Sequence, residues 1–165
     1  MKQIHEYLNE KQIRKGMIVL PLRRTDYDAV CDMDKISGFG LKQCVKDIHG
    51  YNDYSWGLYL FDELIGYCTI GGVDDVYYAI EECPLYTPEA YLLSDIFIRP
   101  EYRHHNYGIQ MIKQVIAKRI AADSLFNDEK YPVFLESISE NLVPYYKKAG
   151  FSSISNDELC MILLP

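Results

Sequence analysis

The chain has 165 residues, 48% of them hydrophobic, and a formal net charge of −7. This length and apolar content fit one core, so we predict a single domain over residues 1–165. The acidic balance, with no local run of Lys or Arg, argues against nucleic acid as a partner and favours a cationic one. The cysteines are scattered, which predicts free thiols. The first residues are polar and no apolar stretch reaches about 18 residues, so we predict a cytoplasmic protein without membrane contact.

The first part of the chain is predicted to form a strand followed by two helices. Residues 1–15 alternate charged and apolar types and fit a short extra N-terminal helix. The apolar run 17–22 predicts a strand, and a helix is expected to begin near Tyr27. A second helix, with apolar residues at helical spacing, is predicted up to the Gly50 stop. The apolar face of the first helix is expected to hold Val30 and Met33.

A hairpin and a long loop are predicted next. Residues 56–61 and 64–70 have the composition of strands, and Asp62-Glu63 between them has the length of a tight turn, although it lacks glycine. Residues 71–90 contain glycines, prolines and several acids, which is typical of a loop.

The second half of the chain alternates strands and helices. Strands are predicted over 91–98, 131–138 and 158–164, with helices over 107–122 and 142–149. The first of these helices has the strongest apolar periodicity in the chain. The complete order of elements predicts an α/β fold with a mixed sheet and helices on both faces.

The chemistry is expected where the strand 91–98 meets the helix that follows. A loop that enters a helix N-terminus presents backbone N–H groups and the positive end of the helix dipole, which together bind phosphate. The loop here is Arg103-His104-His105-Asn106-Tyr107-Gly108. An ordinary strand-to-helix turn, in which Gly108 only eases packing and Arg103 is a surface charge, is the simpler alternative.

Two segments resemble the signatures of the GNAT (GCN5-related N-acetyltransferase) family. The loop 103–108, preceded by Pro100-Glu101-Tyr102, is similar to the family's acetyl-CoA motif, (Gln/Arg)-x-x-Gly-x-(Gly/Ala). The first glycine of the motif is replaced by Asn106, the residue type that best tolerates a left-handed backbone after glycine. The segment 141–151, Asn-Leu-Val-Pro-Tyr-Tyr-Lys-Lys-Ala-Gly-Phe, resembles the second signature, and 20–27 looks like the family's first strand and helix start.

The resemblance implies a fold with a mixed six- to seven-stranded sheet and an acetyl-CoA-dependent N-acetyltransferase that needs no metal. Adjacent His104 and His105 diverge as neighbours in a loop and lack a third ligand at metal spacing. Asn141 is expected to bond the cofactor arm, with helix N-capping as its alternative role. The residues that the resemblance assigns to CoA, through backbone groups at the pyrophosphate or the pantetheine arm, are Ile96, Phe97, Ile98, Arg103, His104, His105, Asn106, Tyr107, Gly108, Ile109 and Asn141.

Tyr146 is the predicted catalytic residue, because a phenol near the thioester can protonate the departing CoA sulfur. Its alternative role is packing under the sheet. The general base is less defined. Some relatives have a Glu at the position occupied here by Leu92, so Asp95, Glu136 or water are the candidates.

The acceptor is predicted to be a small cationic amine. Carboxylates and aromatic rings alternate in the segment before residue 91, which suits an amine cation, although a solvated acidic loop explains the same residues. A peptide or protein acceptor and a CoA-binding sensor or scaffold without catalysis stay open, and a tRNA-acetylating toxin is ranked last because the chain is acidic. A homodimer through the terminal strand 158–164 is a further expectation.

Overall fold

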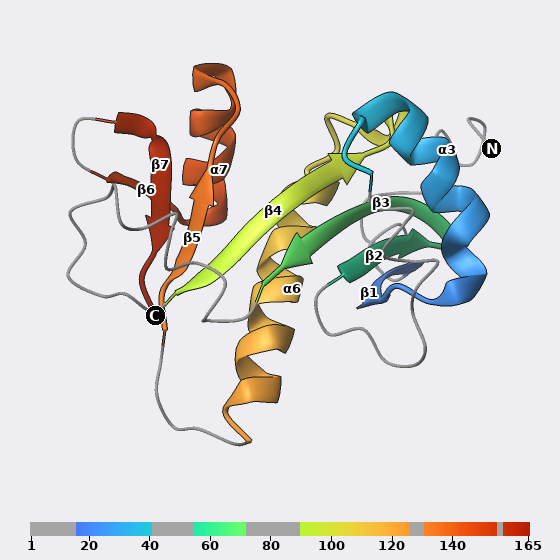
Figure 1. Cartoon of the computed structure of the whole chain (residues 1–165), viewed down its shortest axis with the longest axis horizontal. Helices are drawn as coiled ribbons and strands as arrows, with labels where there is room; N and C mark the ends of the chain where they lie inside the picture. Colours follow the sequence, from blue (N-terminus) through green and yellow to red (C-terminus); the bar gives the residue numbers. More distant parts are fainter. Residues whose placement is uncertain (1–15, 41–54, 72–89, 126–130, 155–156) are drawn as a thin grey trace. The chain divides into compact units, whose positions relative to one another are not determined.

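The computed structural model describes residues 16–40, 55–71, 90–125, 131–154 and 157–165. Its strands form a seven-stranded sheet in the order β1-β2-β3-β4-β5-β7-β6 (Figure 1). The sheet is mixed, because β1 and β2 are antiparallel whereas β4 and β5 are parallel. This confirms the predicted fold class. The strands are β1 (Met17–Pro21), β2 (Ser55–Leu60), β3 (Glu63–Ile70), β4 (Tyr91–Ile98), β5 (Val133–Glu136), β6 (Ser152–Ile154) and β7 (Asp157–Leu163).

The α-helices within the described residues are α3 (Tyr27–Ser37), α6 (Tyr107–Asp123) and α7 (Val143–Ala149), close to the predicted bounds. By contacts the chain divides into two compact units. The first unit joins Met1–Cys68 to Asp95–Gly108, and the second joins Thr69–Ser94 to Ile109–Pro165. Both β4 and α6 therefore have residues in each unit.

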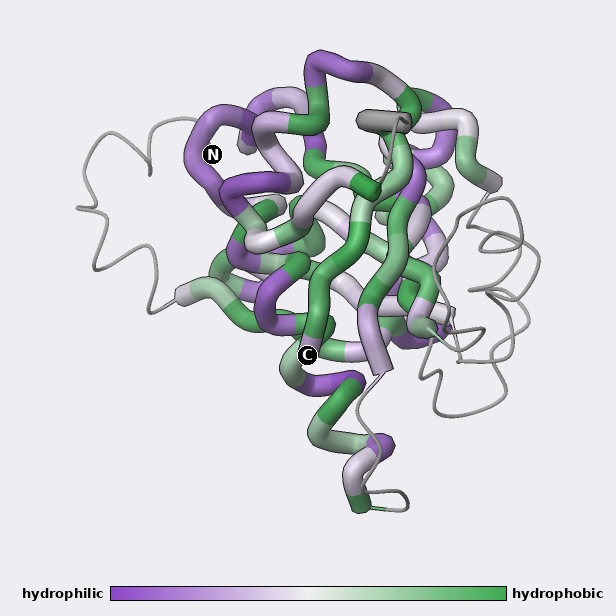
Figure 2. Tube along the Cα trace, turned by 90° about the vertical axis from the view of Figure 1, so that its left-hand side faces the viewer, coloured by the Kyte–Doolittle hydropathy of each residue, from purple (hydrophilic) through white to green (hydrophobic). Residues whose placement is uncertain are grey.

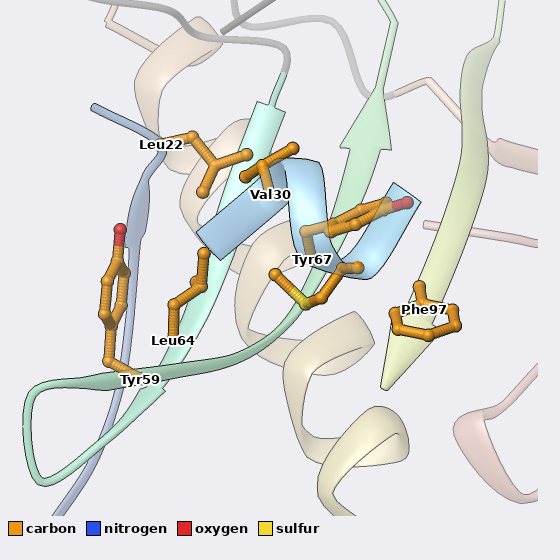
Figure 3. Close-up of a cluster of buried hydrophobic side chains, with 7 residues drawn as sticks. Leu22, Val30, Tyr59, Leu64, Tyr67 and Phe97 are labelled. Carbon is orange, nitrogen blue, oxygen red and sulfur yellow. The ribbon is translucent and has the colours of Figure 1, made fainter. Parts of the chain in front are cut away.

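The core of the first unit lies between α3 and the strands β2 and β3. Val30 and Met33 of α3 are 0% and 1% exposed, which confirms the predicted apolar face. Figure 3 shows the side chains of Leu22, Val30 and Leu64 gathered beside α3. The helix ends at Gly38, whose φ of 75° closes the last turn in the left-handed conformation that glycine adopts at little cost. The buried members of this cluster are Leu22, Val30, Met33, Tyr59, Leu64, Tyr67 and Phe97.

Two tyrosine hydroxyls fasten α3 and its first turn to the hairpin. Tyr59 donates to Asp26 at 2.6 Å, and Tyr67 donates to Asp34 at 2.9 Å. Both carboxylates are buried, so these bonds satisfy groups whose desolvation would otherwise be costly. Burial raises the pKa of both phenols, and the adjacent carboxylates add to the rise. The hydroxyls therefore stay protonated and continue to donate through the neutral pH range.

The hairpin turn lies one residue earlier than predicted. The turn residues are Phe61 and Asp62, with φ of 48° and 67°, rather than Asp62 and Glu63. Two consecutive positive φ values match the right-handed twist of a hairpin, although they strain residues other than glycine. The ring of Phe61 occupies the space that a Cβ on Gly16 would need, and the Phe61 N–H donates to the Gly16 carbonyl at 3.1 Å.

The second unit combines the start of β4 with the C-terminal strands. β5 pairs with β7 over four residue pairs, from Val133↔Leu163 to Glu136↔Cys160. Tyr91 at the start of β4 donates its hydroxyl to Asp123 at the end of α6, at 2.6 Å. The stripe predicted for α6 faces inward, since Ile112 and Val115 are both 0% exposed. In Figure 2, hydrophobic stretches of the tube follow the extended segments.

The C-terminal hairpin corrects two predictions. β6 was missed, because three residues are too few for a periodic pattern to show. β6 pairs with β7 on the side opposite β5, so β7 is an inner strand of the sheet. The terminal strand therefore is not the exposed edge through which a homodimer was expected to form. β5 is also shorter than predicted, since it ends at Glu136. The next residue, Ser137, still donates its N–H to the Leu159 carbonyl of β7 at 2.8 Å, and its Oγ donates to the Ser139 carbonyl at 2.8 Å.

Three predictions lie outside the described residues: the extra helix 1–15, the helix up to Gly50, and the loop 71–90 beyond Gly71. Across the part of the chain that is described, no helix has the length and apolar character needed to cross a membrane.

Candidate active site

The strand β4 changes its backbone geometry near its middle. Its ladder with β5 contains two residue pairs, Tyr91↔Val133 and Leu92↔Phe134. Asp95 then has a φ of 50°, which interrupts regular strand geometry. Beyond it, the Arg99 N–H donates to the Ile65 carbonyl of β3 at 2.9 Å. Because backbone groups alternate sides along a strand, this bond directs those of Ile96 and Ile98 away from β3.

A single turn of 3-10 helix, Pro100–Tyr102, connects β4 to the loop. Proline begins the turn, where a missing N–H costs nothing. The N–H of Tyr102 donates to the Arg99 carbonyl at 2.9 Å, and that of Arg103 donates to the Pro100 carbonyl at 3.2 Å. The turn therefore satisfies its own backbone groups and fixes the direction in which the chain enters the loop.

The loop itself alternates backbone conformations. His104 and Asn106 have φ of 68° and 60°, both in the left-handed region. The expectation that Asn106 adopts this conformation in place of glycine is confirmed. The same conformation at His104 was not predicted, since histidine gives only a weak signal for it. The side chains of residues 103–106 are exposed, whereas Tyr107 and Gly108 are buried. The accessible part of the loop is therefore its polar surface.

The side chain of Arg103 turns back onto the strand that precedes it. Its Nε donates to the Ile98 carbonyl at 3.0 Å, and its guanidinium lies 5.4 Å from the centre of the Phe97 ring. A cation over an aromatic face is attractive, so both contacts stabilise the closed loop. The Arg103 side chain therefore links the loop to the end of β4. The Ile98 carbonyl, which the resemblance assigns to pantetheine, already accepts this one hydrogen bond.

Helix α6 begins at Tyr107, as predicted, directly after the loop. In an α-helix the first backbone N–H groups have no carbonyl one turn earlier, and the dipole makes this end positive. The first residues of α6 are Tyr107, Gly108 and Ile109. The ring of His105 lies 5.6 Å from that of Tyr107. A loop with left-handed residues that leads directly into a helix N-terminus fits an anionic diphosphate.

Tyr146 lies on α7 and is held by aromatic rings. Its ring packs edge-on against Tyr145 and Phe151, with centroid distances of 5.4 Å and 6.4 Å. The residue is 8% exposed, and burial raises the pKa of its phenol. α7 ends at Gly150, whose φ of 113° turns the chain so that Phe151 reaches the Tyr146 ring. The phenol is therefore neutral at physiological pH and positioned by packing.

Asn141 does not cap α7. The cap of this region is Ser139, whose side chain accepts from the Asn141 N–H at 3.3 Å. Asn141 lies in the short 3-10 turn that follows, and its side chain is exposed. The alternative role given to Asn141 was therefore wrong, and its side chain amide is not used in capping. Ser139 was the capping residue that the sequence analysis overlooked.

The two candidate bases lie in different surroundings. Asp95 is half-buried at the left-handed position of β4. Burial raises the pKa of the Cys68 thiol, and the charge of Asp95 adds to the rise. Glu136 is exposed at the end of β5, opposite Cys160 in the ladder. Leu92 packs against the apolar cluster that includes Ala90 and Phe134. At the position where some relatives have a Glu, this chain therefore has an apolar side chain that packs on the core.

The predicted site residues fall into both compact units. The first unit brings together Ile96, Phe97, Ile98 and the loop 103–108. Ile109, Asn141 and Tyr146 belong to the second unit, as does Glu136. Among the described residues, no three His, Cys, Asp or Glu side chains are grouped as a metal site would require.

Comparison with known proteins identifies the family. The model of the acetyltransferase (GNAT) family matches residues 23–151, most of the chain. The chain therefore belongs to the GNAT family and is an N-acetyltransferase. No curated protein sequence matches it significantly.

Solved structures share the fold at low sequence identity. A tyrosine-to-phenylalanine mutant of the AtaT toxin, bound to the C-terminus of the antitoxin AtaR, is 15% identical, with a TM-score of 0.63 over 90% of this chain and 93% of that one. The Bacillus subtilis N-acetyltransferase YlbP, in complex with coenzyme A, is 16% identical, with a TM-score of 0.56 over 90% and 97%. Ard1 from Thermoplasma volcanium is 13% identical, with a TM-score of 0.61 over 91% and 99%.

Proposed function

We propose that the chain transfers the acetyl group of acetyl-CoA to a primary amine, with the loop 103–108 and the start of α6 holding the CoA pyrophosphate. One observation carries the proposal. The motif loop keeps two left-handed residues, His104 and Asn106, immediately before the N-terminus of α6, although its first glycine is absent. A backbone that keeps this strained shape without glycine is better explained by a ligand-binding role than by an ordinary turn.

The reaction has simple requirements. A neutral amine attacks the thioester carbonyl carbon, a C–N bond forms, and the C–S bond breaks as CoA leaves. The nitrogen loses one proton and the sulfur gains one, so the products are an amide and free CoA thiol. Tyr146 is the proposed donor to the sulfur, because burial keeps its phenol protonated.

The identity of the general base is less well defined than that of the general acid. Most alkylamines are protonated at neutral pH and must lose that proton before attack. Asp95 is half-buried and Glu136 is exposed, so Asp95 is the better-placed carboxylate to hold a proton away from bulk water. Water that carries the proton to solvent is the alternative, and substitution of Asp95 distinguishes the two.

A small cationic amine is the proposed acceptor, and the net charge of −7 supports it through long-range attraction. The acidic and aromatic residues expected to select it lie in 72–89, outside the described residues. A peptide or protein N-terminus is the second candidate. The similar fold of the AtaT toxin is compatible with a toxin role, but at 15% identity it carries information on the fold alone.

The test is product formation. Purified protein is incubated with acetyl-CoA and separate pools of polyamines, aminoglycosides and peptides, and acetylated products are identified by mass spectrometry, with Tyr146→Phe as control. Acetylated amine that depends on Tyr146 supports the proposal and names the acceptor class. Binding of acetyl-CoA without turnover in any pool would replace transfer by a sensor or scaffold role.

A further inference from the structure

One carboxylate outside the motif contacts the segment that leads into the loop. Glu63, the first residue of β3, accepts a hydrogen bond from the Tyr102 hydroxyl at 2.9 Å through Oε2. Its other oxygen, Oε1, lies 3.6 Å from Nη1 of Arg99. The two side chains of this ion pair are 23% and 22% exposed, and Tyr102 is 6% exposed. The interactions are therefore shielded from much of the solvent screening that weakens surface ion pairs.

Backbone bonds connect the same segment to β3. The Arg99 N–H donates to the Ile65 carbonyl at 2.9 Å, two residues beyond Glu63, and the Tyr102 N–H donates to the Arg99 carbonyl at 2.9 Å. Tyr102 is followed directly by Arg103, the first residue of the loop. The turn 99–102 is thus fixed at its start by a backbone bond and at its end by the hydroxyl bond to Glu63.

The loop needs such a support. Left-handed residues other than glycine persist only where surrounding structure enforces them, and both His104 and Asn106 are of this kind. Residues 103–106 are exposed, so core packing does little to hold them beyond the contacts of Arg103 with Phe97 and of His105 with Tyr107. The fixed points of the loop are the Tyr102 end, the Arg103 bond to the Ile98 carbonyl, and the start of α6.

We infer that Glu63 is a positioning residue for acetyl-CoA: by holding Tyr102 and Arg99 it sets the loop geometry that binds the pyrophosphate. The inference rests on the proposed function. Glu63 acts through Tyr102 and does not itself contact the ligand. Its carboxylate would repel a diphosphate, so its contribution to binding is through geometry and not through charge.

The bond between Glu63 and Tyr102 persists across the working pH range. Burial raises the pKa of the Tyr102 phenol to about 12, and the bond to Glu63 adds to the rise. The phenol therefore remains a donor at every pH where an acetyltransferase would be assayed. A hydrogen bond to a charged group is stronger than one between neutral groups, so the pair suits a structural strut.

The experiment compares Glu63→Ala, Glu63→Gln and Tyr102→Phe with wild type. The dissociation constant of acetyl-CoA is measured by calorimetry, and KM and kcat are measured with an accepted amine. Tyr59→Phe is the matched control, because it removes a hydroxyl bond to Asp26 in the same unit, between two residues that are not part of the segment 99–108. Thermal melts show whether each variant is folded.

Glu63→Ala and Tyr102→Phe are expected to raise the dissociation constant and KM for acetyl-CoA about tenfold, with kcat at saturation changed less than about twofold. Glu63→Gln, which still accepts from Tyr102, is expected to bind within about threefold of wild type. Tyr59→Phe is expected to lower the melting temperature without changing KM. If Glu63→Ala fails to fold, the Tyr102→Phe variant alone tests the inference, because it removes only the hydroxyl and keeps the aromatic ring.

Two results would overturn the inference in different ways. Folded Glu63→Ala and Tyr102→Phe that bind acetyl-CoA as wild type does would show that Glu63 supports only the fold, while the proposed function stands. Wild-type protein that binds no acetyl-CoA would remove the proposed function and the inference together.

Discussion

The two signature regions of this chain build their parts of the site in different ways. In the segment 96–108 the groups proposed to bind the ligand are backbone N–H groups beside two left-handed residues. The loop side chains 103–106 are exposed, and that of Arg103 also donates to the Ile98 carbonyl. In the segment 141–151 the proposed catalytic group is one side chain, Tyr146, buried between two aromatic rings.

This difference predicts how each region responds to substitution. A backbone site tolerates most side chains and fails when bulk or negative charge enters the space of the ligand, or when the chain cannot adopt the required φ. A side-chain site fails when one functional group is removed, even if its shape is kept. The first region should therefore control binding, and the second should control the rate of transfer.

The largest effect is expected from Gly108→Glu, which places a carboxylate against the proposed pyrophosphate position. Binding of acetyl-CoA should weaken by more than about 100-fold, because like charges repel strongly where water is excluded. The measurement is the ligand-induced shift in melting temperature. At 100 times the dissociation constant the wild type should gain about 5–10 °C, and the variant should gain nothing measurable.

Gly108→Ala is the matched control for that prediction. It adds a methyl group without charge and replaces glycine in the first turn of α6 by a better helix former, which contributes about 0.5–1 kcal/mol. Retained binding in this variant assigns the loss in Gly108→Glu to charge. Equal loss of the shift in both variants would contradict the backbone account of the first region.

The second effect is on kcat. Tyr146→Phe keeps the ring packing and removes the proton donor, so kcat should fall about 100-fold with the dissociation constant of acetyl-CoA unchanged. Steady-state kinetics and calorimetry on the same preparation separate the two quantities. Tyr145→Phe, which keeps the neighbouring ring, is the control and should retain activity. Weaker acetyl-CoA binding with unchanged kcat in Tyr146→Phe would place the residue in binding instead.

The pH profile sharpens the same assignment. Burial raises the pKa of the Tyr146 phenol above its ordinary value of about 10. The acid form is needed, so it is fully present below pH 10 and is lost only as pH rises through the higher folded-state pKa. The rate attributable to Tyr146 should thus show no decline between about pH 7 and pH 10, the ordinary value for tyrosine. A decline centred near pH 8 would point to another acid.

A smaller effect is expected from Asp95→Asn. Asparagine also accepts a positive φ, so this substitution removes the charge of Asp95, whose φ is 50°, at little cost to the backbone. If Asp95 is the base, kcat/KM at neutral pH should fall about tenfold or more and recover as pH rises toward the pKa of the amine. Glu136→Gln, at an exposed position, is the comparison and should stay within about twofold of wild type. Unchanged kinetics in Asp95→Asn would assign the proton to water.

The smallest effect is expected from Asn106→Gly, which restores the glycine of the family motif. Glycine adopts the φ of 60° freely, so relief of strain should tighten acetyl-CoA binding by at most about fivefold. Calorimetry against wild type measures this change. Asn106→Val, a branched residue that resists a positive φ, should weaken binding, and equal affinity of all three would mean that the loop conformation does not limit binding.

Strong periodicity and family motifs made much of the fold predictable. The apolar stripe of α6 and the run that forms β4 fixed those elements to within a residue, because burial on one face leaves a clear pattern. The three-residue strand β6 carried no such pattern. β6 pairs with β7 in a local hairpin, with Ile154 opposite Asp157, so missing β6 also meant missing the inner position of β7.

The candidate site was predictable where it depends on local sequence. The left-handed Asn106 followed from the residue type at a glycine position. The support from Glu63 was not predictable, since it lies 39 residues from Tyr102 and only the pairing of β3 with β4 brings them together. Likewise the hairpin turn shifted by one residue, because packing of Phe61 on Gly16 outweighed the local preference of the turn residues.

The most direct measurement is calorimetric titration of acetyl-CoA into the wild-type protein. We predict saturable binding of one acetyl-CoA per chain with a micromolar dissociation constant, and weaker apparent affinity for acetyl-CoA when free CoA, which carries the same pyrophosphate, is present as a competitor. The absence of binding heat at any temperature tested, together with no melting shift at millimolar acetyl-CoA, would contradict the claim that the loop 103–108 and the start of α6 form a CoA site.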